Sequence, residues 1–133
     1  MPSSHTDSRL IEKRMNNKVA VVGTGLMGGN MALALHGAGM DVVGYDVSSE
    51  SLENLRFRGV AVTNDLQAAV GNADFIVSSL PNSQIVLSAW LGAGGVLEYA
   101  RPGAVVIEMS SIDPDTMKKL GEACKDKGLA VVD

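Results

Sequence analysis

A short pattern of glycines constrains the fold of this chain more than any other feature. Its six residues are Gly23, Thr24, Gly25, Leu26, Met27 and Gly28, which form a G-x-G-x-x-G sequence. The apolar run at residues 19–22 precedes it, and a segment rich in Met, Ala and Leu follows it. A continuous apolar run is typical of a strand buried on both faces. The pattern therefore predicts a strand, a tight turn and a helix.

Each glycine has a distinct use in such a turn. Gly23 permits the change of direction from strand to helix, and Gly28 lets the helix pack closely on the strand. Gly25 carries no Cβ, so a pyrophosphate can approach the N–H groups at the positive end of the helix. Asp46 follows the next apolar run, 23 residues after Gly23, where it can accept hydrogen bonds from both hydroxyls of an adenosine ribose. These positions predict a dinucleotide-binding turn.

The residues around Asp46 bear on which dinucleotide binds. Its negative charge would face the 2′-phosphate of NADP, and the next residue is Val47 rather than an arginine. We therefore expect NAD as the cofactor and weaker binding of NADP. Arg56 and Arg58 lie on the next predicted helix and could reach the 2′-phosphate. We favour the interpretation that both are solvated charges of that helix.

The rest of the chain alternates short apolar runs with helical segments. We expect strands at residues 18–22, 41–46, 60–62, 73–80, 103–109 and 129–132. We expect helices at residues 26–38, 48–58, 64–70, 83–90, 95–100 and 114–127. Their N-caps would be Ser48 or Ser49, Asn64, and Asp113 before Pro114. This alternation predicts an α/β fold of Rossmann type, a doubly wound and mainly parallel six-stranded sheet with strand order 3-2-1-4-5-6.

Length and composition fit one domain in a reducing compartment. The 133 residues suit a single domain at 18–133, preceded by a polar extension at 1–17 that we interpret as disordered or as a remnant of expression. A net charge of −4 does not indicate a basic surface for nucleic acid, and no apolar run is long enough to span a membrane. Cys124 is the only cysteine, so no internal disulfide is expected and a buried helix position is favoured. A cytoplasmic location follows as an expectation.

Three stretches carry a resemblance to a known family. They are residues 22–32, which include Met27 after the second glycine, Leu80-Pro81-Asn82-Ser83, and residues 108–114 with the sequence Glu-Met-Ser-Ser-Ile-Asp-Pro. Together they resemble the amino-terminal half of β-hydroxyacid dehydrogenases, a family that includes 3-hydroxyisobutyrate dehydrogenase and tartronate semialdehyde reductase. The resemblance runs from about Lys18 to the end of the chain, and it does not separate these two branches.

The resemblance implies roles for residues outside the glycine turn. Leu80, Pro81 and Asn82 would lie beside the cofactor at the carboxyl end of the fourth strand. Ser110 would lie near the nicotinamide and the substrate, and Ser111 near the substrate. From the residues alone, Pro81 and Asn82 equally suit a strand stop with an N-cap, and the two serines suit an ordinary loop. Both places are carboxyl ends of parallel strands, where open α/β sheets bind ligands.

The resemblance also implies an activity for the longer protein. It would be an NAD-dependent oxidoreductase that transfers a hydride to or from a small 3-hydroxy acid, of the 3-hydroxyisobutyrate or tartronate semialdehyde/D-glycerate type. It would be a homo-oligomer with an all-helical second domain. The catalytic lysine and its partner asparagine of this family would lie beyond Asp133, so no catalytic residue and no metal site are expected in this chain. The lysines at 118, 119, 125 and 127 match no catalytic position.

Two other classes of function are compatible with the glycine turn. A stand-alone domain that senses NAD or NADH needs the turn and Asp46, but it has no need of the Leu80 and Ser110 motifs. A purely structural α/β module needs neither. The additional motifs favour the enzyme, with the 133-residue chain itself binding cofactor without turnover.

Overall fold

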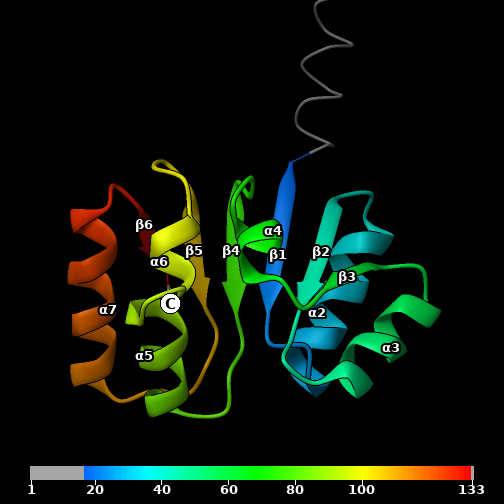
Figure 1. The fold of residues 1–133 in the computed structure, drawn as a ribbon, viewed down its shortest axis with the longest axis horizontal. Helices are drawn as coiled ribbons and strands as arrows, with labels where there is room; N and C mark the ends of the chain where they lie inside the picture. Colours follow the sequence, from blue (N-terminus) through cyan, green and yellow to red (C-terminus); the bar gives the residue numbers. More distant parts are fainter. Residues whose placement is uncertain (1–16, 133) are drawn as a thin grey trace, which may run out of the picture.

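The computed structural model describes residues 17–132, and these form one sheet flanked by helices (Figure 1). The strands are β1 (Lys18–Val22), β2 (Asp41–Tyr45), β3 (Ala61–Thr63), β4 (Phe75–Ser78), β5 (Val105–Glu108) and β6 (Ala130–Val132). The helices are α2 (Leu26–Gly37), α3 (Ser49–Phe57), α4 (Leu66–Val70), α5 (Ser83–Leu91), α6 (Val96–Tyr99) and α7 (Pro114–Asp126). Every element expected from the sequence is present.

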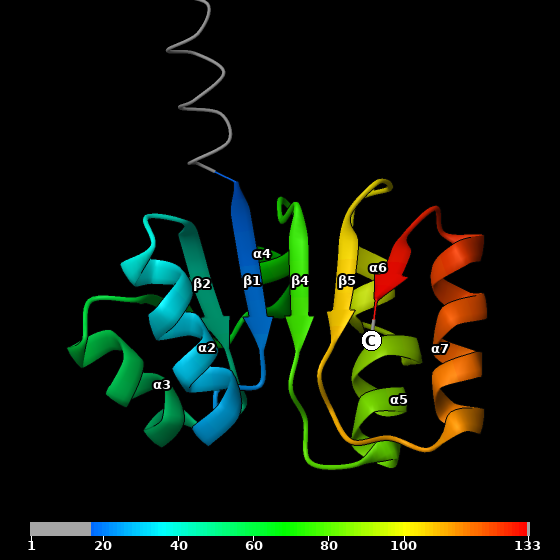
Figure 2. The same cartoon turned by 180° about the vertical axis from the view of Figure 1, so that it is seen from behind.

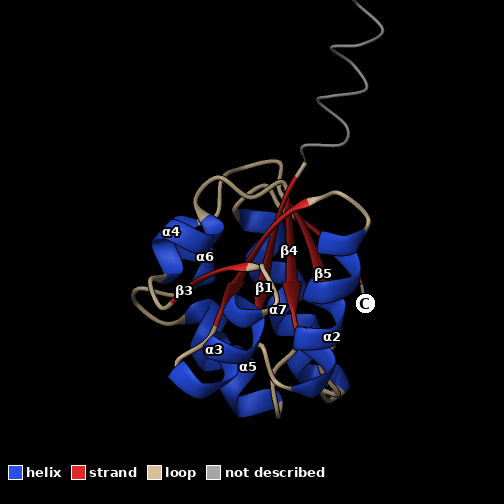
Figure 3. Ribbon diagram, turned by 90° about the vertical axis from the view of Figure 1, so that its right-hand side faces the viewer, coloured by secondary structure: helices blue, strands red, loops and turns tan. Residues whose placement is uncertain are grey.

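The sheet has the predicted Rossmann topology. Its strand order is β3-β2-β1-β4-β5-β6, and all five neighbouring pairs are parallel. Helices cover both faces of the sheet, as the side view in Figure 3 shows. The chain starts in the middle of the sheet and winds first to one edge and then to the other, so β1 and β4 lie side by side where the order reverses. Ligands of such sheets bind at this reversal, outside the carboxyl ends of the strands.

The strand arrows point to the lower edge of the sheet in Figure 1, where the loops after β1, β2, β4 and β5 gather. These loops and the first turn of α2 carry all the residues that the sequence marked as a site. Their positions are fixed by a core of fully buried side chains, of which Trp90 is the largest. The Trp90 indole N–H donates to the Ser78 hydroxyl at 3.2 Å, which joins α5 to the end of β4.

One half of the sheet is covered on a single face. Figure 2 shows α2 and α3 on the side of β1 and β2, and no helix in front of β4 and β5. A shallow groove of about 250 Å³ runs over this uncovered part. Its lining is apolar and consists of Val19, Met31, Leu35, Met40, Phe75, Val77, Ile107 and Met109. Val19 and Val77 of this lining are buried, and Met31 and Leu35 belong to α2, which borders the groove.

The structure corrects one helix cap. We expected Asn64 to cap the helix at 64–70, but the helix begins at Leu66 and its cap is Asp65. The Asp65 carboxylate accepts from the backbone N–H groups of Gln67 and Ala68. The Thr63 hydroxyl in turn accepts from the Asp65 N–H, so β3 and the turn after it extend one residue further than expected.

The other boundaries agree with the expected ones within about two residues, and Ser48 and Asp113 are N-caps as expected. The expectation for the extension at 1–17 falls on residues of which only Asn17 is described. Cys124 is buried in α7, as the sequence favoured. None of the described helices combines the length and apolar composition that crossing a membrane requires.

Candidate functional site

The turn after β1 leaves no room for side chains at two of its three glycines. Gly23 has a φ of +97°, and a Cβ there would lie 2.0 Å from the Ser79 carbonyl oxygen. A Cβ at Gly28 would lie 1.8 Å from the Gly23 carbonyl oxygen. Both contacts are with backbone atoms, which cannot move aside. Gly23 and Gly28 are therefore required for the turn and for the packing of α2 on it, as the sequence predicted.

Gly25 differs from the other two glycines. A Cβ built at Gly25 would meet nothing within 4 Å, and its φ of −64° suits any residue. The protein therefore does not need a glycine here for its own folding. Open space in front of this backbone is what a closely approaching phosphate group requires.

The amino end of α2 is also uncapped. The side chains of Ser48, Asp65, Asn82 and Asp113 cap α3, α4, α5 and α7 by accepting from first-turn N–H groups. Gly25 has no side chain to do this for α2, and the first turn of α2 contains no acidic residue. The N–H groups there, together with the positive end of a 12-residue helix, are free to receive an anion.

Asp46 lies directly after β2, beside the glycine turn. Its Oδ2 accepts from the Thr24 N–H at 2.8 Å and from the Thr24 hydroxyl at 3.1 Å. Its Oδ1 accepts from the Ser48 N–H at 2.9 Å. A carboxylate offers about four acceptor positions, so one position on Oδ1 stays open. The sequence led us to expect acceptance from two ribose hydroxyls, whereas this arrangement offers one such position.

A cavity of about 280 Å³ opens between Asp46 and the loop after β4, at the reversal of strand order. Gly23, Asp46 and Leu80, which the sequence assigned to cofactor binding, all line it. The remaining lining comes from Val22, Tyr45, Val47, Leu66, Ile85, Ser88, Ala89 and residues 93–95. Most of these side chains are apolar, and the cavity approaches the size of small-molecule sites. Sequence reasoning missed Leu66 and Ile85, since they reach the cavity from α4 and α5.

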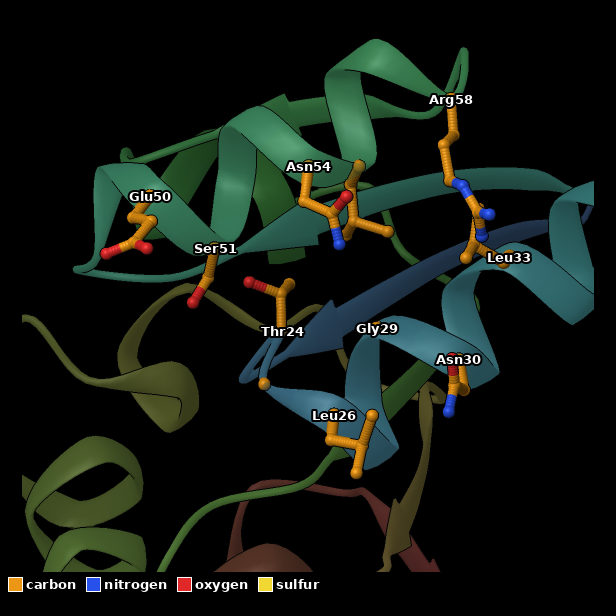
Figure 4. A pocket seen from close by; sticks show the side chains of 11 residues that line it. Thr24, Leu26, Gly29, Asn30, Leu33, Glu50, Ser51, Asn54 and Arg58 are labelled. Carbon is orange, nitrogen blue, oxygen red and sulfur yellow. The ribbon is translucent and has the colours of Figure 1, made fainter.

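A second cavity, of about 570 Å³, lies on the other side of the turn, between α2 and α3 (Figure 4). Thr24, Gly25 and Leu26 line it from the turn, and Arg58 lines its far end. Arg56 instead pairs with Glu53 at 2.8 Å in a solvent-exposed contact on α3. Neither arginine contacts Asp46, which fits the expectation of two solvated helix charges.

The loops after β4 and β5 are tied together through one serine. The Ser110 hydroxyl accepts from the Leu80 N–H at 2.7 Å, and the Glu108 Oε1 accepts from the Ser110 N–H at 2.8 Å. Asn82 caps α5 by accepting from the Ile85 N–H at 2.9 Å, which leaves its NH₂ group free to donate. Leu80, Asn82 and Ser110 thus lie at adjacent strand ends. Pro81 and Ser111 are exposed in the same two loops.

A further link joins the starts of α5 and α7. The Asp113 N–H donates to the Ser83 hydroxyl at 3.2 Å. Hydrogen bonding with the Ser83 side chain, and then from the N–H and hydroxyl of Thr116, lowers the pKa of Asp113 to about 2. Asp113 therefore stays charged, and its N-cap stays intact, until the pH falls well below 3.8.

Glu108 is a buried carboxylate that the sequence did not single out. It is 4% exposed at the end of β5. While Oε1 accepts from Ser110, Oε2 has no hydrogen-bond partner within residues 17–132. Burial, with the Glu108 charge as a second cause, raises the pKa of the Cys124 thiol to about 11. The hydrogen bond that Glu108 makes among the described residues is the one to the Ser110 N–H, so this side chain holds the Ser110 loop.

Two substitutions of Glu108 should separate these effects. Glu108→Gln keeps an oxygen for the Ser110 N–H and removes the charge, so we expect unchanged or higher stability and a lower pKa of Cys124. Glu108→Ala leaves that N–H unpaired and should lower the free energy of unfolding by about 1–3 kcal/mol. Urea unfolding followed by circular dichroism measures the free energy of unfolding of the two variants. Equal losses in the two variants would contradict this interpretation of Glu108.

No lysine of the described chain lies at the site. The three lysines on α7 and Lys127 just after it are exposed, and Lys18 begins β1 at the opposite edge of the sheet. Within residues 17–132, no group of three or more His, Cys, Asp or Glu side chains is placed to hold a metal ion. What the described residues assemble is an uncapped helix end, an acidic residue and a largely apolar cavity.

This fold with this turn defines a class, the dinucleotide-binding Rossmann domains. Comparison with known families identifies the family within this class. Residues 18–133 match the NAD binding domain of 6-phosphogluconate dehydrogenase, and the chain belongs to that family. NAD is the cofactor after which the family is described, in agreement with the cofactor expected from the sequence.

Individual relatives confirm the resemblance to hydroxyacid dehydrogenases. The 2-(hydroxymethyl)glutarate dehydrogenase of Eubacterium barkeri is 32% identical over 116 residues, which are 87% of this chain and 38% of that protein. The NAD-dependent L-serine dehydrogenase of Pseudomonas aeruginosa is 34% identical over 116 residues, which are 87% of this chain and 39% of that protein. The solved structure of Mycobacterium tuberculosis 3-hydroxyisobutyrate dehydrogenase with L-serine superposes with a TM-score of 0.81 at 28% identity, covering 87% of this chain and 39% of that one. The chain therefore spans about two fifths of the length of these relatives.

Proposed function

We propose that this chain is the NAD-binding domain of an oxidoreductase that transfers a hydride between NAD and a small 3-hydroxy acid. The observation that carries the proposal is the turn at Gly25. Its backbone is open to solvent, and the helix end behind it is uncapped and free of acidic residues. A pyrophosphate placed there would receive the first N–H groups of α2, with one half of the dinucleotide directed toward Asp46 and the other toward Ser110.

We propose that the adenosine half occupies the cavity beside Asp46. We propose that the ribose donates to the open position on Asp46 Oδ1, and that the adenine packs against the apolar lining that includes Leu66, Leu80 and Ile85. We propose that the nicotinamide half extends across the loops after β4 and β5, past Pro81 and Asn82 toward Ser110. Bound NAD would supply the hydride chemistry, while these residues hold and orient it.

We propose that the substrate site and the acid–base group are completed by residues of a longer polypeptide like those of the relatives. We propose that Ser110 and Ser111 contribute to the substrate site, and that residues 18–133 form the cofactor domain. The relatives act on different hydroxy acids by name, so the proposal extends only to small 3-hydroxy acids. These relatives favour an oxidoreductase over a stand-alone NAD sensor.

Calorimetric titration with the two cofactors tests the proposal. We expect NAD to bind and NADP to bind more weakly, because the 2′-phosphate would meet the Asp46 carboxylate and Val47 offers no charge to compensate. Asp46→Ala should bring the two dissociation constants closer together, and Asp126→Ala, which removes an exposed acidic residue at the end of α7, should leave their ratio unchanged. Equal or tighter binding of NADP by the unaltered chain would overturn the assignment of Asp46.

A further inference from the structure

The side chain of Thr24 makes a contact that the glycine pattern does not require. The second position of the G-x-G-x-x-G pattern is free to vary, and the Thr24 N–H alone would bond to Asp46 whatever residue stood there. The hydroxyl adds a second bond to the same Oδ2 atom at 3.1 Å. Thr24 is 5% exposed, so little solvent competes for this contact.

Packing fixes the orientation of that hydroxyl. A Cβ built on Gly44 would lie 3.1 Å from the Thr24 methyl and 3.0 Å from the Leu55 side chain, so the methyl lies directly over Gly44 in β2. A β-branched side chain has few χ1 states, and one held by its methyl has fewer. Figure 4 shows Thr24 rising from the turn after β1 toward the amino end of α3. The hydroxyl is thereby held against Asp46.

We propose that Thr24 is a positioning residue that sets the preference for NAD over NADP by fixing the Asp46 carboxylate. This rests on the proposed function. Oδ2 is occupied by two donors from Thr24, and the open acceptor position is on Oδ1, where a ribose hydroxyl can donate. To admit a 2′-phosphate, the carboxylate has to turn away. Turning away breaks both bonds from Thr24, so the hydroxyl adds to the penalty that NADP meets.

Two substitutions at position 24 isolate the hydroxyl. Thr24→Val keeps the methyl over Gly44 and the backbone N–H, and it removes only the donor to Oδ2. Because hydrogen bonds to charged groups are among the stronger ones, we expect the ratio of the NADP to the NAD dissociation constant to fall about three- to tenfold. Thr24→Ser restores the donor and should keep the ratio within about twofold of the unaltered chain.

The ratio of the two dissociation constants is the readout, since a purely structural defect weakens the binding of both cofactors alike. Calorimetric titrations with NAD and NADP are run on each variant and repeated in an Asp46→Ala background, where Thr24→Val should leave the ratio unchanged. If Thr24→Val does not give a folded protein by circular dichroism, Thr24→Ala takes its place against Thr24→Ser. A wild-type ratio in the variant without the hydroxyl, or the same fall with Asp46 absent, overturns the role of Thr24. Failure of the unaltered chain to bind NAD instead overturns the proposed function itself.

Discussion

Replacing Gly25 by valine is expected to abolish NAD binding while the fold survives. The Cβ at this position meets no atom of the protein, so folding has no need of glycine here. A branched side chain would nevertheless occupy the space in front of the α2 N–H groups. Loss of two hydrogen bonds to a charged phosphate, at about 1.5 kcal/mol each, weakens binding about 100-fold or more. Calorimetry measures the affinity, and circular dichroism measures the fold.

Gly28→Ala is the matched control for this prediction. It adds a smaller side chain to the same turn, but its Cβ would lie 1.8 Å from the Gly23 carbonyl oxygen. We expect it to lower the free energy of unfolding by at least about 2 kcal/mol, with or without cofactor. The two glycines should therefore separate binding from stability. A folded Gly25→Val variant with unchanged affinity for NAD would show that no phosphate binds at this turn.

The second large effect concerns turnover. At saturating NAD, the 133-residue chain is expected to oxidise neither 3-hydroxyisobutyrate nor D-glycerate. A general acid–base group must exchange the hydroxyl proton, and its loss alone costs about 10²–10⁴-fold in rate. In the loop after β5 the described residues offer the hydroxyls of Ser110 and Ser111, which are weak acids, and the Asp113 carboxylate, whose pKa of about 2 makes it a weak base. Glu108 is buried at the end of β5.

The measurement follows NADH absorbance with each hydroxy acid at one protein concentration. A longer polypeptide that continues past Asp133 as the relatives do is expected to turn over at least one of them. The comparison also measures what a second domain adds by positioning the substrate and excluding water. Clear turnover by the 133-residue chain that Ser110→Ala abolishes would show that residues 1–133 already contain a complete active site.

Much of the fold could be read from the sequence because local patterns encode it. Apolar runs mark strands buried on both faces, and the glycine turn fixes where the first helix starts. Asp65 shows the limit of such reading. Asn64 and Asp65 are both good caps, and in the structure the Asp65 carboxylate accepts from the N–H groups of Gln67 and Ala68. Propensity alone does not separate two neighbouring residues that both favour the cap position.

The candidate site divides along similar lines. The sequence predicted a strand, a glycine turn and a helix with Asp46 after the next strand, and the family resemblance implied roles for the two loops that carry Leu80 and Ser110. The sequence led us to expect that Asp46 would be open to two ribose hydroxyls. The structure leaves one acceptor position, because Thr24 and Ser48 already donate to the carboxylate.

Only the tertiary structure decided which of these site residues contact one another. Thr24 and Asp46 are 22 residues apart, and Leu80 and Ser110 are 30 apart, yet each pair shares a hydrogen bond. Such contacts depend on which strands are neighbours, on their parallel register and on the rotamer of one hydroxyl. Periodicity in the sequence specifies which face of a strand is buried, but the partner of a polar atom is set by geometry across the sheet. Likewise, that Glu108 is buried with one oxygen lacking a partner among residues 17–132 could be learned only from the assembled core.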